Sequence, residues 1–290
     1  MSDKVPIAAV FPAYNRISDS LQTLATIKAC NPAPAEIIVH VDGGAHDVAR
    51  TLAEAHPDVR IMVSEGFVGP GGARNMLVRE ARHEWVANFD DDSQPDHPDY
   101  FARALETAAR FPDAAVISAA SMEWEKHTPG FMRFGIFSGC GCVYRRSAFL
   151  QTAGYVPLRI AYCMEEVDLS LRFHEAGAVI VHDPLLRVNH RKVPPARVSS
   201  EVNAHVLANI GLMPLLRYPW PLLPLAFVHI VMRAAQLVRA GYWGALVQGL
   251  LMLPGYAARH WHHRAPASFN TLLEWWRLRR DPECLDFREP

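Results

Sequence analysis

Residues 85–95 read Trp-Val-Ala-Asn-Phe-Asp-Asp-Asp-Ser-Gln-Pro, an apolar run that ends in three adjacent carboxylates. A short apolar run bounded by polar residues is typical of a buried strand. Three neighbouring aspartates repel one another, and each raises the pKa of the others unless a cation compensates their charge. The alternative is a solvated acidic turn that caps a helix beginning near Pro98. The stretch predicts a strand that ends in a cation site or in an acidic turn.

Outward from this stretch, similar short apolar runs recur along the first two thirds of the chain. They are Pro6–Phe11, Glu36–Val41, Val59–Val63, Ala114–Ser118 and Ala178–His182. Segments with helical spacing of apolar residues lie between them, at Ser18–Cys30, Ala45–His56, Gly72–His83 and Pro98–Phe111. Strands that alternate with helices predict βαβ units, and so an α/β fold: a Rossmann-like, mostly parallel sheet sandwiched by helices. We expect the functional loops at the carboxyl ends of the strands.

Composition excludes several classes of protein. The chain has 290 residues, half of them hydrophobic, and a formal net charge of −1. It is long enough for one large domain, or a domain with an appendage, and too apolar to be disordered. A near-zero charge argues against a nucleic-acid partner. Five scattered cysteines without a CxxC pair, together with an N-terminus that reads as a strand rather than a signal peptide, favour a cytoplasmic protein.

The pattern changes near Val193-Pro194-Pro195, after which strand signals vanish. We therefore expect an α/β domain over residues 1–192 and a helical extension over 193–290. The extension is basic, with 12 Lys and Arg against 6 Asp and Glu in residues 191–290. Its apolar stretch Trp220–Met232 has 13 residues, whereas a spanning helix needs about 20. The sequence predicts no transmembrane segment there.

Two helices of the extension, Ala226–Ala240 and Tyr242–Leu253, are expected to be apolar over most of their circumference. Such helices must be buried in a core, against a partner or in a lipid interface. The basic cluster of arginines and histidines within residues 259–264 favours anionic headgroups. Two readings remain open: contact with an anionic membrane surface, or packing on the sheet domain or in a homodimer.

A second carboxylate cluster lies at Glu165, Glu166 and Asp168. Acidic residues at the start of a helix are stabilised by the helix dipole, and this alone could explain them. However, Gly177 and the strand after it limit the helix to Glu165–Ala176, so its acidic start is aimed at one rim of the sheet. The cluster is a candidate for acid–base chemistry.

Glycines precede another predicted helix, in Gly69-Pro70-Gly71-Gly72-Ala73-Arg74-Asn75. A glycine-rich approach to a helix N-terminus can bind an anion. The segment lacks the Lys-Ser/Thr of a P-loop and the spacing of a dinucleotide fingerprint. Arg74 could instead form a forked pair with a nucleotide or with a neighbouring carboxylate.

Taken in order, these pieces resemble the family 2 glycosyltransferases with the GT-A fold, inverting enzymes that use nucleotide diphosphate sugars. The resemblance covers about 185 residues. The matching motifs are Phe11-Pro12-Ala13-Tyr14-Asn15-Arg16, Val41-Asp42-Gly43-Gly44, Gly72-Ala73-Arg74-Asn75, Asp90-Asp91-Asp92, Ser138-Gly139 with Arg145-Arg146, Glu165-Glu166-Val167-Asp168-Leu169 with Arg172, and His190.

The resemblance implies two groups of binding residues. The nucleotide sugar would be bound by Pro12, Ala13, Tyr14, Asn15, Asp42, Arg74, Asp90 and Asp91. A Mg²⁺ or Mn²⁺ ion on the diphosphate would be held by Asp90 and Asp92, with His190 as a further ligand. A strand-end histidine without a ligand role is the alternative for His190.

The resemblance also implies the chemistry. Inversion needs one general base to take the proton of the acceptor hydroxyl. Glu166 occupies the Asp position of the family's Glu-Asp motif and is one methylene longer, so the catalytic base is either Glu166 or Glu165. Asp168 and Arg172 are expected to fix the helix. The implied product is a bacterial surface polysaccharide or glycolipid, made on a glycan or lipid-linked acceptor in the cytoplasm or at the inner face of the cell membrane.

Two other functions use similar features. A nucleotidyltransferase that makes nucleotide sugars also has a Rossmann-like sheet and acidic metal ligands, but it usually carries a glycine-rich basic loop where this chain has residues 12–16. A non-catalytic nucleotide-sugar-binding module would not need the glutamate pair beside an intact Asp-x-Asp motif.

Overall fold

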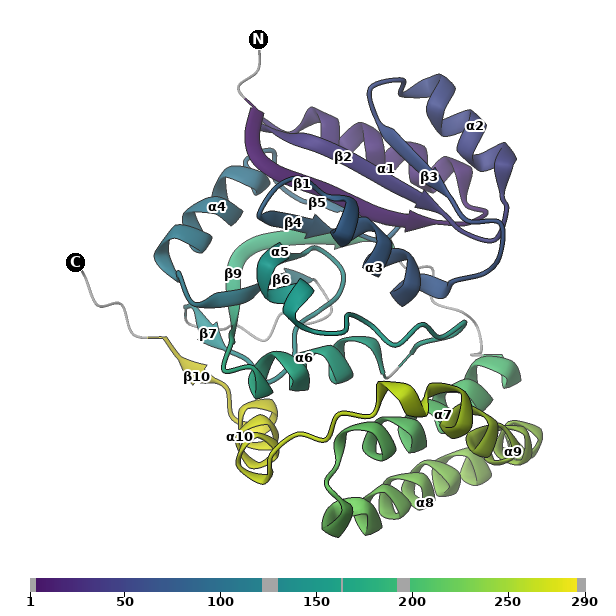
Figure 1. Ribbon diagram of the computed structural model, residues 1–290. Helices are drawn as coiled ribbons and strands as arrows, with labels where there is room; N and C mark the ends of the chain where they lie inside the picture. Colours follow the sequence, from purple (N-terminus) through teal and green to yellow (C-terminus); the bar gives the residue numbers. More distant parts are fainter. Residues whose placement is uncertain (1–3, 122–129, 163, 192–198, 286–290) are drawn as a thin grey trace.

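The computed structural model describes residues 4–121, 130–162, 164–191 and 199–285. A single mixed sheet forms its centre, in the strand order β10-β7-β9-β6-β8-β4-β1-β2-β3, with β5 paired to β9 (Figure 1). The six expected strands are β1 (Lys4–Ala13), β2 (Ala33–Val41), β3 (Arg60–Val63), β4 (Trp85–Asn88), β6 (Ala114–Ser121) and β9 (Val179–His190). The pairs β1–β2, β1–β4, β2–β3 and β6–β9 are parallel. The predicted α/β class is confirmed.

The alternation of side chains along β1 separates two layers of helices. Ile7, Ala9 and Phe11 face a core made with α1 (Ile17–Ala29), α2 (His46–Ala55) and α4 (Tyr100–Arg110). Ala8 and Val10 face the opposite core, made with α3 (Gly69–Glu80), α5 (Arg146–Gln151) and α6 (Glu165–Glu175). Both faces of the central strands are thus buried, which explains their continuous apolar runs.

Four short strands were not expected from the sequence: β5 (Ser93–Pro95), β7 (Met132–Arg133), β8 (Cys142–Arg145) and β10 (Glu283–Cys284). The strand β8 lies between β4 and β6 and is antiparallel to both. It has only four residues and follows a glycine-rich segment, so periodicity could not identify it. Because β8 reverses direction, β4 and β6 run the same way, and the carboxyl ends of β1, β2, β4 and β9 lie at one edge of the sheet.

The extension forms α7 (Ser200–Arg217), η2 (Trp220–Leu222), α8 (Leu223–Arg239), α9 (Trp243–His260), η3 (Trp261–His263) and α10 (Phe269–Arg280). A third core joins Leu171 of α6 to Leu216 of α7 and Trp275 of α10. The chain then returns to the sheet, where β10 pairs with β7 (Figure 1). The expected boundary at residue 192 lies outside the described residues.

The apolar helical stretch of the extension is longer than the sequence pattern indicates. The helical segment Trp220–Arg239 has 20 residues and is long and apolar enough, by length and composition only, to cross a membrane. The length was underestimated because Pro221 and Pro224 lie in the first turns of η2 and α8, where a missing N–H costs nothing. Within this chain α8 is mostly exposed, since only Ala226 and Leu237 of the helix are buried. Of the expected modes of burial, a core within this chain is therefore not observed for most of α8, and a partner or a lipid interface remain open.

Candidate active site

The three aspartates follow β4 at the carboxyl edge of the sheet. The Asp90 backbone N–H donates a hydrogen bond of 2.7 Å to Oγ of Ser93, which closes the turn. The Asp91 and Asp92 side chains are more buried than the Asp90 side chain, which is 25% exposed. Asp90 therefore presents the most accessible carboxylate of the three.

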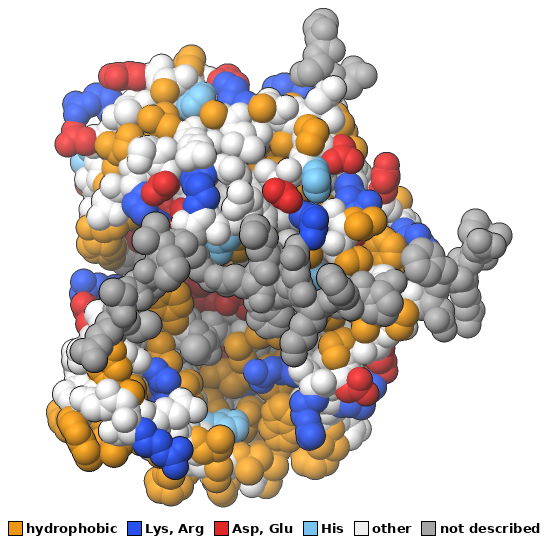
Figure 2. All heavy atoms as spheres, turned by 180° about the vertical axis from the view of Figure 1, so that it is seen from behind, with side chains coloured by type: hydrophobic (Ala, Val, Ile, Leu, Met, Phe, Trp, Pro, Cys, Tyr) orange, Lys and Arg blue, Asp and Glu red, His pale blue; other side chains and the backbone are white. Residues whose placement is uncertain are grey.

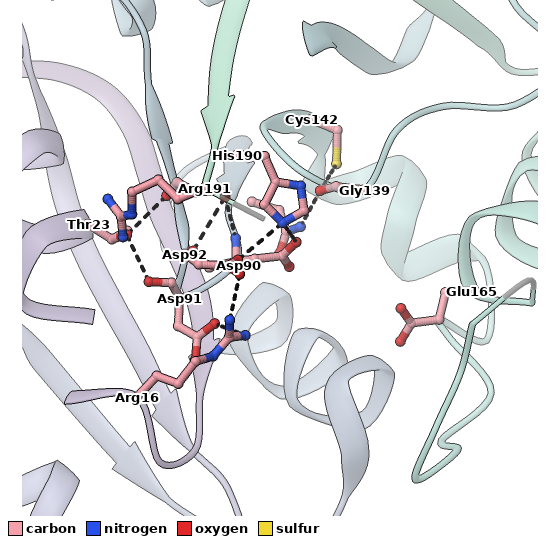
Figure 3. A network of polar contacts seen from close by, with 12 residues as sticks. Arg16, Thr23, Asp90, Asp91, Asp92, Gly139, Cys142, Glu165, His190 and Arg191 are labelled. Atoms are coloured by element: carbon pink, nitrogen blue, oxygen red, sulfur yellow. Dashed lines mark hydrogen bonds and ion pairs between the residues drawn. The ribbon is translucent and has the colours of Figure 1, made fainter. Parts of the chain in front are cut away.

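Arg16, just beyond β1, compensates two of these charges. Its guanidinium lies 2.6 Å from Oδ1 of Asp91 and 2.5 Å from Oδ2 of Asp92 (Figure 3). Burial raises the pKa of Asp91 to about 7 even though Arg16 opposes the shift. Burial acts in the same direction on Asp92, but hydrogen bonds and charge from His190 and Arg16 prevail and lower its pKa to about 2. No sequence pattern assigned a role to Arg16, because its partners Asp91 and Asp92 lie 75 and 76 residues away in the chain.

His190, at the end of β9, points into the aspartate cluster (Figure 3). Its Nε2 is 3.2 Å from Oδ1 of Asp92 and 3.8 Å from Oδ2 of Asp90. The fold thus brings together all three residues expected to bind a metal. Asp90, His190 and Cys140 also place one ligand atom each within 4.8 Å of the others, a group that could hold an ion. The sequence analysis did not single out Cys140, because the cysteines form no CxxC pair.

Arg74 of α3 joins the two acidic clusters. Its Nη2 is 2.5 Å from Oδ1 of Asp90, and its Nη1 is 2.9 Å from Oε2 of Glu165. The Arg74 side chain is only 5% exposed, so both ion pairs form in a region from which most water is excluded. The forked pair considered for Arg74 is therefore made with carboxylates in this structure.

Glu166 differs from Glu165 in its surroundings. Arg74 pairs with Glu165, whereas the Glu166 carboxylate lies against Gly139, where an added Cβ would come within 2.1 Å of Oε1. Burial, and next the negative charge of Glu165, raise the pKa of Glu166 to about 7. A carboxylate that titrates near neutral pH is suited to proton transfer. Glu166 is thus the better candidate for the base.

The residues expected to surround the nucleotide lie at the ends of β1 and β2. Pro12 and Ala13 pair in register with His40 and Val41, which brings Asp42 beside Tyr14 and Asn15. The Asp42 carboxylate accepts hydrogen bonds from the backbone N–H groups of residues 43, 68 and 69 and from the Ser64 hydroxyl, so it orders the loop before α3.

That loop carries an aromatic residue that the sequence did not single out. Phe67 is exposed, and its ring centroid lies 4.9 Å from that of Tyr14, which is also exposed. Two exposed aromatic rings in edge contact offer a surface on which a flat ring can stack. Phe67 is isolated among polar and small residues, so no sequence pattern marked it.

The expected structural role of Asp168 and Arg172 is confirmed. Arg172 Nη2 is 2.6 Å from Oδ2 of Asp168 on the next turn of α6. Arg217 of α7 also pairs with Asp168, and its Nη1 donates to the His263 carbonyl oxygen. The helix that begins with the glutamate pair is thereby attached to the extension.

Comparison with known proteins agrees with this geometry. Residues 8–130 match the model of the glycosyl transferase family 2. A segment of 109 residues is 35% identical to the succinoglycan biosynthesis protein ExoO of Rhizobium meliloti (strain 1021), and it covers 37% of this chain but only 31% of that protein. Another alignment of 240 residues is 24% identical to the N-acetylglucosaminyl-diphospho-decaprenol L-rhamnosyltransferase of Mycobacterium tuberculosis (strain CDC 1551 / Oshkosh), covering 66% of this chain and 77% of that protein.

Solved structures share the fold. The mannosyltransferase PcManGT from Pyrobaculum calidifontis, in complex with GDP-Man and Mn²⁺, superimposes with a TM-score of 0.59 at 16% identity over 97% of this chain and 88% of that one. TarS 1–349 of S. aureus, in complex with UDP-GlcNAc, gives a TM-score of 0.55 at 16% identity over 73% and 67% of the two chains. Residues 8–130 thus match the model of glycosyl transferase family 2, within a chain that shares the GT-A fold of these solved structures.

Proposed function

We propose that the protein is an inverting glycosyltransferase that moves a sugar from a nucleotide diphosphate sugar to an acceptor hydroxyl. One observation carries the proposal: Arg74 pairs with both Asp90 and Glu165, which leaves Glu166 beside the acidic cluster with a pKa near neutrality. A pure binding module has no need of a carboxylate tuned in this way.

In the proposed reaction, Glu166 accepts the proton of the acceptor hydroxyl as the oxygen attacks the anomeric carbon. The bond to the diphosphate breaks on the opposite face of the sugar, and the nucleoside diphosphate leaves with the negative charge. Glu165 pairs with Arg74, and this ion pair holds α3 against α6. Arg74 also fixes the Asp90 carboxylate at the mouth of the cluster.

We further propose that the reaction depends on a divalent cation. When bound, the cation supplies Lewis-acid stabilisation for the departing diphosphate. Asp90 and His190 fit this role, because a carboxylate oxygen and an imidazole nitrogen converge at the partly exposed edge of the cluster. Burial raises the pKa of the Cys140 thiol well above its usual value, so it is protonated and is a weak ligand. A mixed oxygen and nitrogen donor set favours Mn²⁺ over Mg²⁺, which prefers oxygen ligands alone.

The donor's base would stack on Tyr14 and Phe67, next to Asp42. For the acceptor, we propose a glycan or lipid-linked acceptor in polysaccharide or glycolipid synthesis. The support is the similarity to proteins named for succinoglycan biosynthesis and for rhamnosyl transfer to N-acetylglucosaminyl-diphospho-decaprenol.

The test is hydrolysis of the donor in the absence of an acceptor. A panel of nucleotide sugars is screened by thermal shift with Mn²⁺, and the best ligand is then assayed for release of nucleoside diphosphate. Slow release that requires Mn²⁺ and disappears in Glu166→Gln is expected. Release of pyrophosphate from a nucleoside triphosphate and a sugar phosphate would instead identify a nucleotidyltransferase. If the protein binds a donor but shows no turnover even when acceptor mixtures are added, it is a nucleotide-sugar-binding module rather than an enzyme.

A further inference from the structure

We infer that the outward faces of α8 and α9 dock in the plane of an anionic lipid bilayer. This inference stands apart from the proposed reaction, because it rests only on the surface of the extension.

The outward face of α8 is apolar. Phe227, Val228, Val231 and Met232 are exposed, and Phe227 retains 69% of its accessible surface. Their spacing of three and four residues places them on one side of the helix. A helix at the surface of a water-soluble domain carries polar residues at such positions. The outward side of α8 is therefore typical of a surface that contacts another molecule or a lipid phase.

The neighbouring helix α9 repeats the pattern. Trp243, Val247, Leu250 and Leu251 recur at helical spacing and are exposed, with Leu251 retaining 75% of its surface. Gly249, on the inner side of α9, lies against the Ala204 carbonyl oxygen of α7. The apolar positions of α9 thus face away from α7.

The outward sides of α8 and α9 form one surface, which we call the apolar face. It consists of the exposed side chains of the two helices and the flanking rings of Trp220 and Trp261. Both helices pack on α7, most of which is buried, so their exposed sides lie on the far side of the helical layer. Figure 2 shows hydrophobic side chains gathered along the lower part of the molecule, where Figure 1 places α8 and α9. Among the described residues, 19 large hydrophobic side chains are exposed, and 13 of them lie between residues 220 and 273.

Aromatic rings and arginine mark one edge of the apolar face. The ring centroids of Trp220 and Trp261 are 6.2 Å apart, and the Arg264 guanidinium lies 4.5 Å from the first and 5.2 Å from the second. Tryptophan and arginine are favoured where hydrocarbon meets headgroups, because each combines an apolar body with a polar end.

The charge of the extension indicates what covers the apolar face. Residues 202–273 contain no Asp or Glu. Arg239 and Arg259 are exposed near the C-terminal ends of α8 and α9, and Arg264 lies between Trp220 and Trp261. A second copy of this chain would bring one cationic face against another, which is unfavourable. A bilayer with anionic headgroups covers the apolar side chains and compensates the arginines at the same time. The occupant consistent with both features is an anionic bilayer.

The contacts of α8 favour docking in the plane over spanning. On its inner side, Arg233 Nη2 donates a hydrogen bond of 2.6 Å to Oδ1 of Asn203, and His229 packs edge-on against Tyr218. A spanning α8 would lose these partners and expose an arginine and a histidine to hydrocarbon, which is costly. In-plane docking keeps both contacts and immerses only the side that is already exposed.

Flotation of the full chain with vesicles tests the inference. Vesicles of phosphatidylcholine are compared with vesicles that contain 30% phosphatidylglycerol. The wild-type chain should float with the anionic vesicles, less so at high salt, and weakly with the neutral ones. Two single variants, Arg239→Gln and Arg259→Gln, should each lower the partition coefficient between anionic vesicles and water about fivefold. A chain that stays in solution, monodisperse without detergent, overturns the inference.

A matched pair of variants separates the apolar face from general hydrophobicity. Phe227→Ser with Leu251→Ser should lower the partition coefficient at least about tenfold, because both side chains enter the lipid. Leu150→Ser with Leu185→Ser changes two leucines that are exposed elsewhere and should leave it unchanged. Equal losses in the two variants, or a dimer that the first variant dissociates, would contradict lipid docking by this face.

The orientation of α8 relative to the bilayer is measured with a cysteine introduced at Ala240, the residue that follows the helix. In the vesicle-bound chain, Ala240→Cys should react with a membrane-impermeant maleimide added outside, above the labelling of the wild-type chain. Protection of this cysteine until the vesicles are lysed would show that α8 spans, and would overturn the in-plane orientation.

Discussion

Arg217 of α7 donates a hydrogen bond of 2.5 Å from Nε to Oδ1 of Asp168 in α6, and both side chains are almost completely buried. Nη1 of the same guanidinium donates to the His263 carbonyl oxygen. The helix that carries Glu165 and Glu166 is therefore held by a residue of the extension. The extension is part of the scaffold of the candidate site.

Arg217→Met should lower the free energy of unfolding by up to about 3–5 kcal/mol, because among the described residues it leaves the buried Asp168 charge with Arg172 as its one remaining ion-pair partner. Urea denaturation followed by circular dichroism measures the change. Arg280→Met, at an exposed position of the neighbouring helix α10, is the control and should change stability by less than about 0.5 kcal/mol. Equal effects in the two variants would show that the buried pair does not stabilise the fold.

Glu166→Gln should retain donor affinity and lose at least about 10²-fold in the rate of sugar transfer, because glutamine cannot accept the proton. Single-turnover kinetics and calorimetric titration with the donor measure the two quantities. Glu165→Gln instead leaves Arg74 without one of its charged partners, so it should lower stability as well as activity. A selective loss of rate in Glu165→Gln, with Glu166→Gln close to wild type, would transfer the role of base to Glu165.

Gly139→Ala tests the position of the Glu166 carboxylate without changing its chemistry. The added Cβ would lie 2.1 Å from Oε1, so the side chain must move away. We expect a reduced rate of transfer with donor affinity preserved, since a displaced base is less well aligned for proton transfer. Gly66→Ala, where an added Cβ meets nothing within 4 Å, is the matched control. Wild-type turnover in Gly139→Ala would show that Glu166 need not rest against residue 139.

The pH dependence of transfer follows from the raised pKa of Glu166. The group must be ionised to accept a proton, and burial together with the charge of Glu165 raises its pKa from 4.5 to about 7. Below pH 7 the rate should rise about tenfold per pH unit, and above it the rate should level off. The profile is measured in single-turnover assays under donor saturation. A rate that is constant between pH 5 and 8 would exclude a base with this pKa.

Asp92→Asn should abolish transfer and weaken donor binding in the presence of Mn²⁺ while leaving the fold intact. The substitution removes the negative charge that lies 3.2 Å from His190 Nε2 and 2.5 Å from Arg16, and so disturbs the side chains that border the proposed cation site. Calorimetry with Mn²⁺ and the donor, and circular dichroism for the fold, measure the outcome. Turnover near that of the wild type would show that the proposed cation site does not need the Asp92 charge.

The sequence by itself determined the α/β class, the six principal strands and the order of the motifs. These depend on local patterns: the end of an apolar run at Asn88, the acidic start of α6 at Glu165, and the glycines in the first turn of α3. Because the carboxyl ends of parallel strands meet at one edge, the convergence of Asp42, Asp90 and His190 at one edge could be expected from sequence order alone.

Only the tertiary structure decided which partners these residues have. The pairing of Arg74 with Asp90 and Glu165 joins residues separated by 16 and 91 positions, and this pairing distinguishes Glu166 from Glu165. Arg16, Cys140 and Phe67 entered the site in the same way, through contacts between distant segments. The exposure of the apolar face could not be predicted from the sequence either. Helical periodicity shows that α8 and α9 have little polar surface, but it does not show which side of each helix packs on α7.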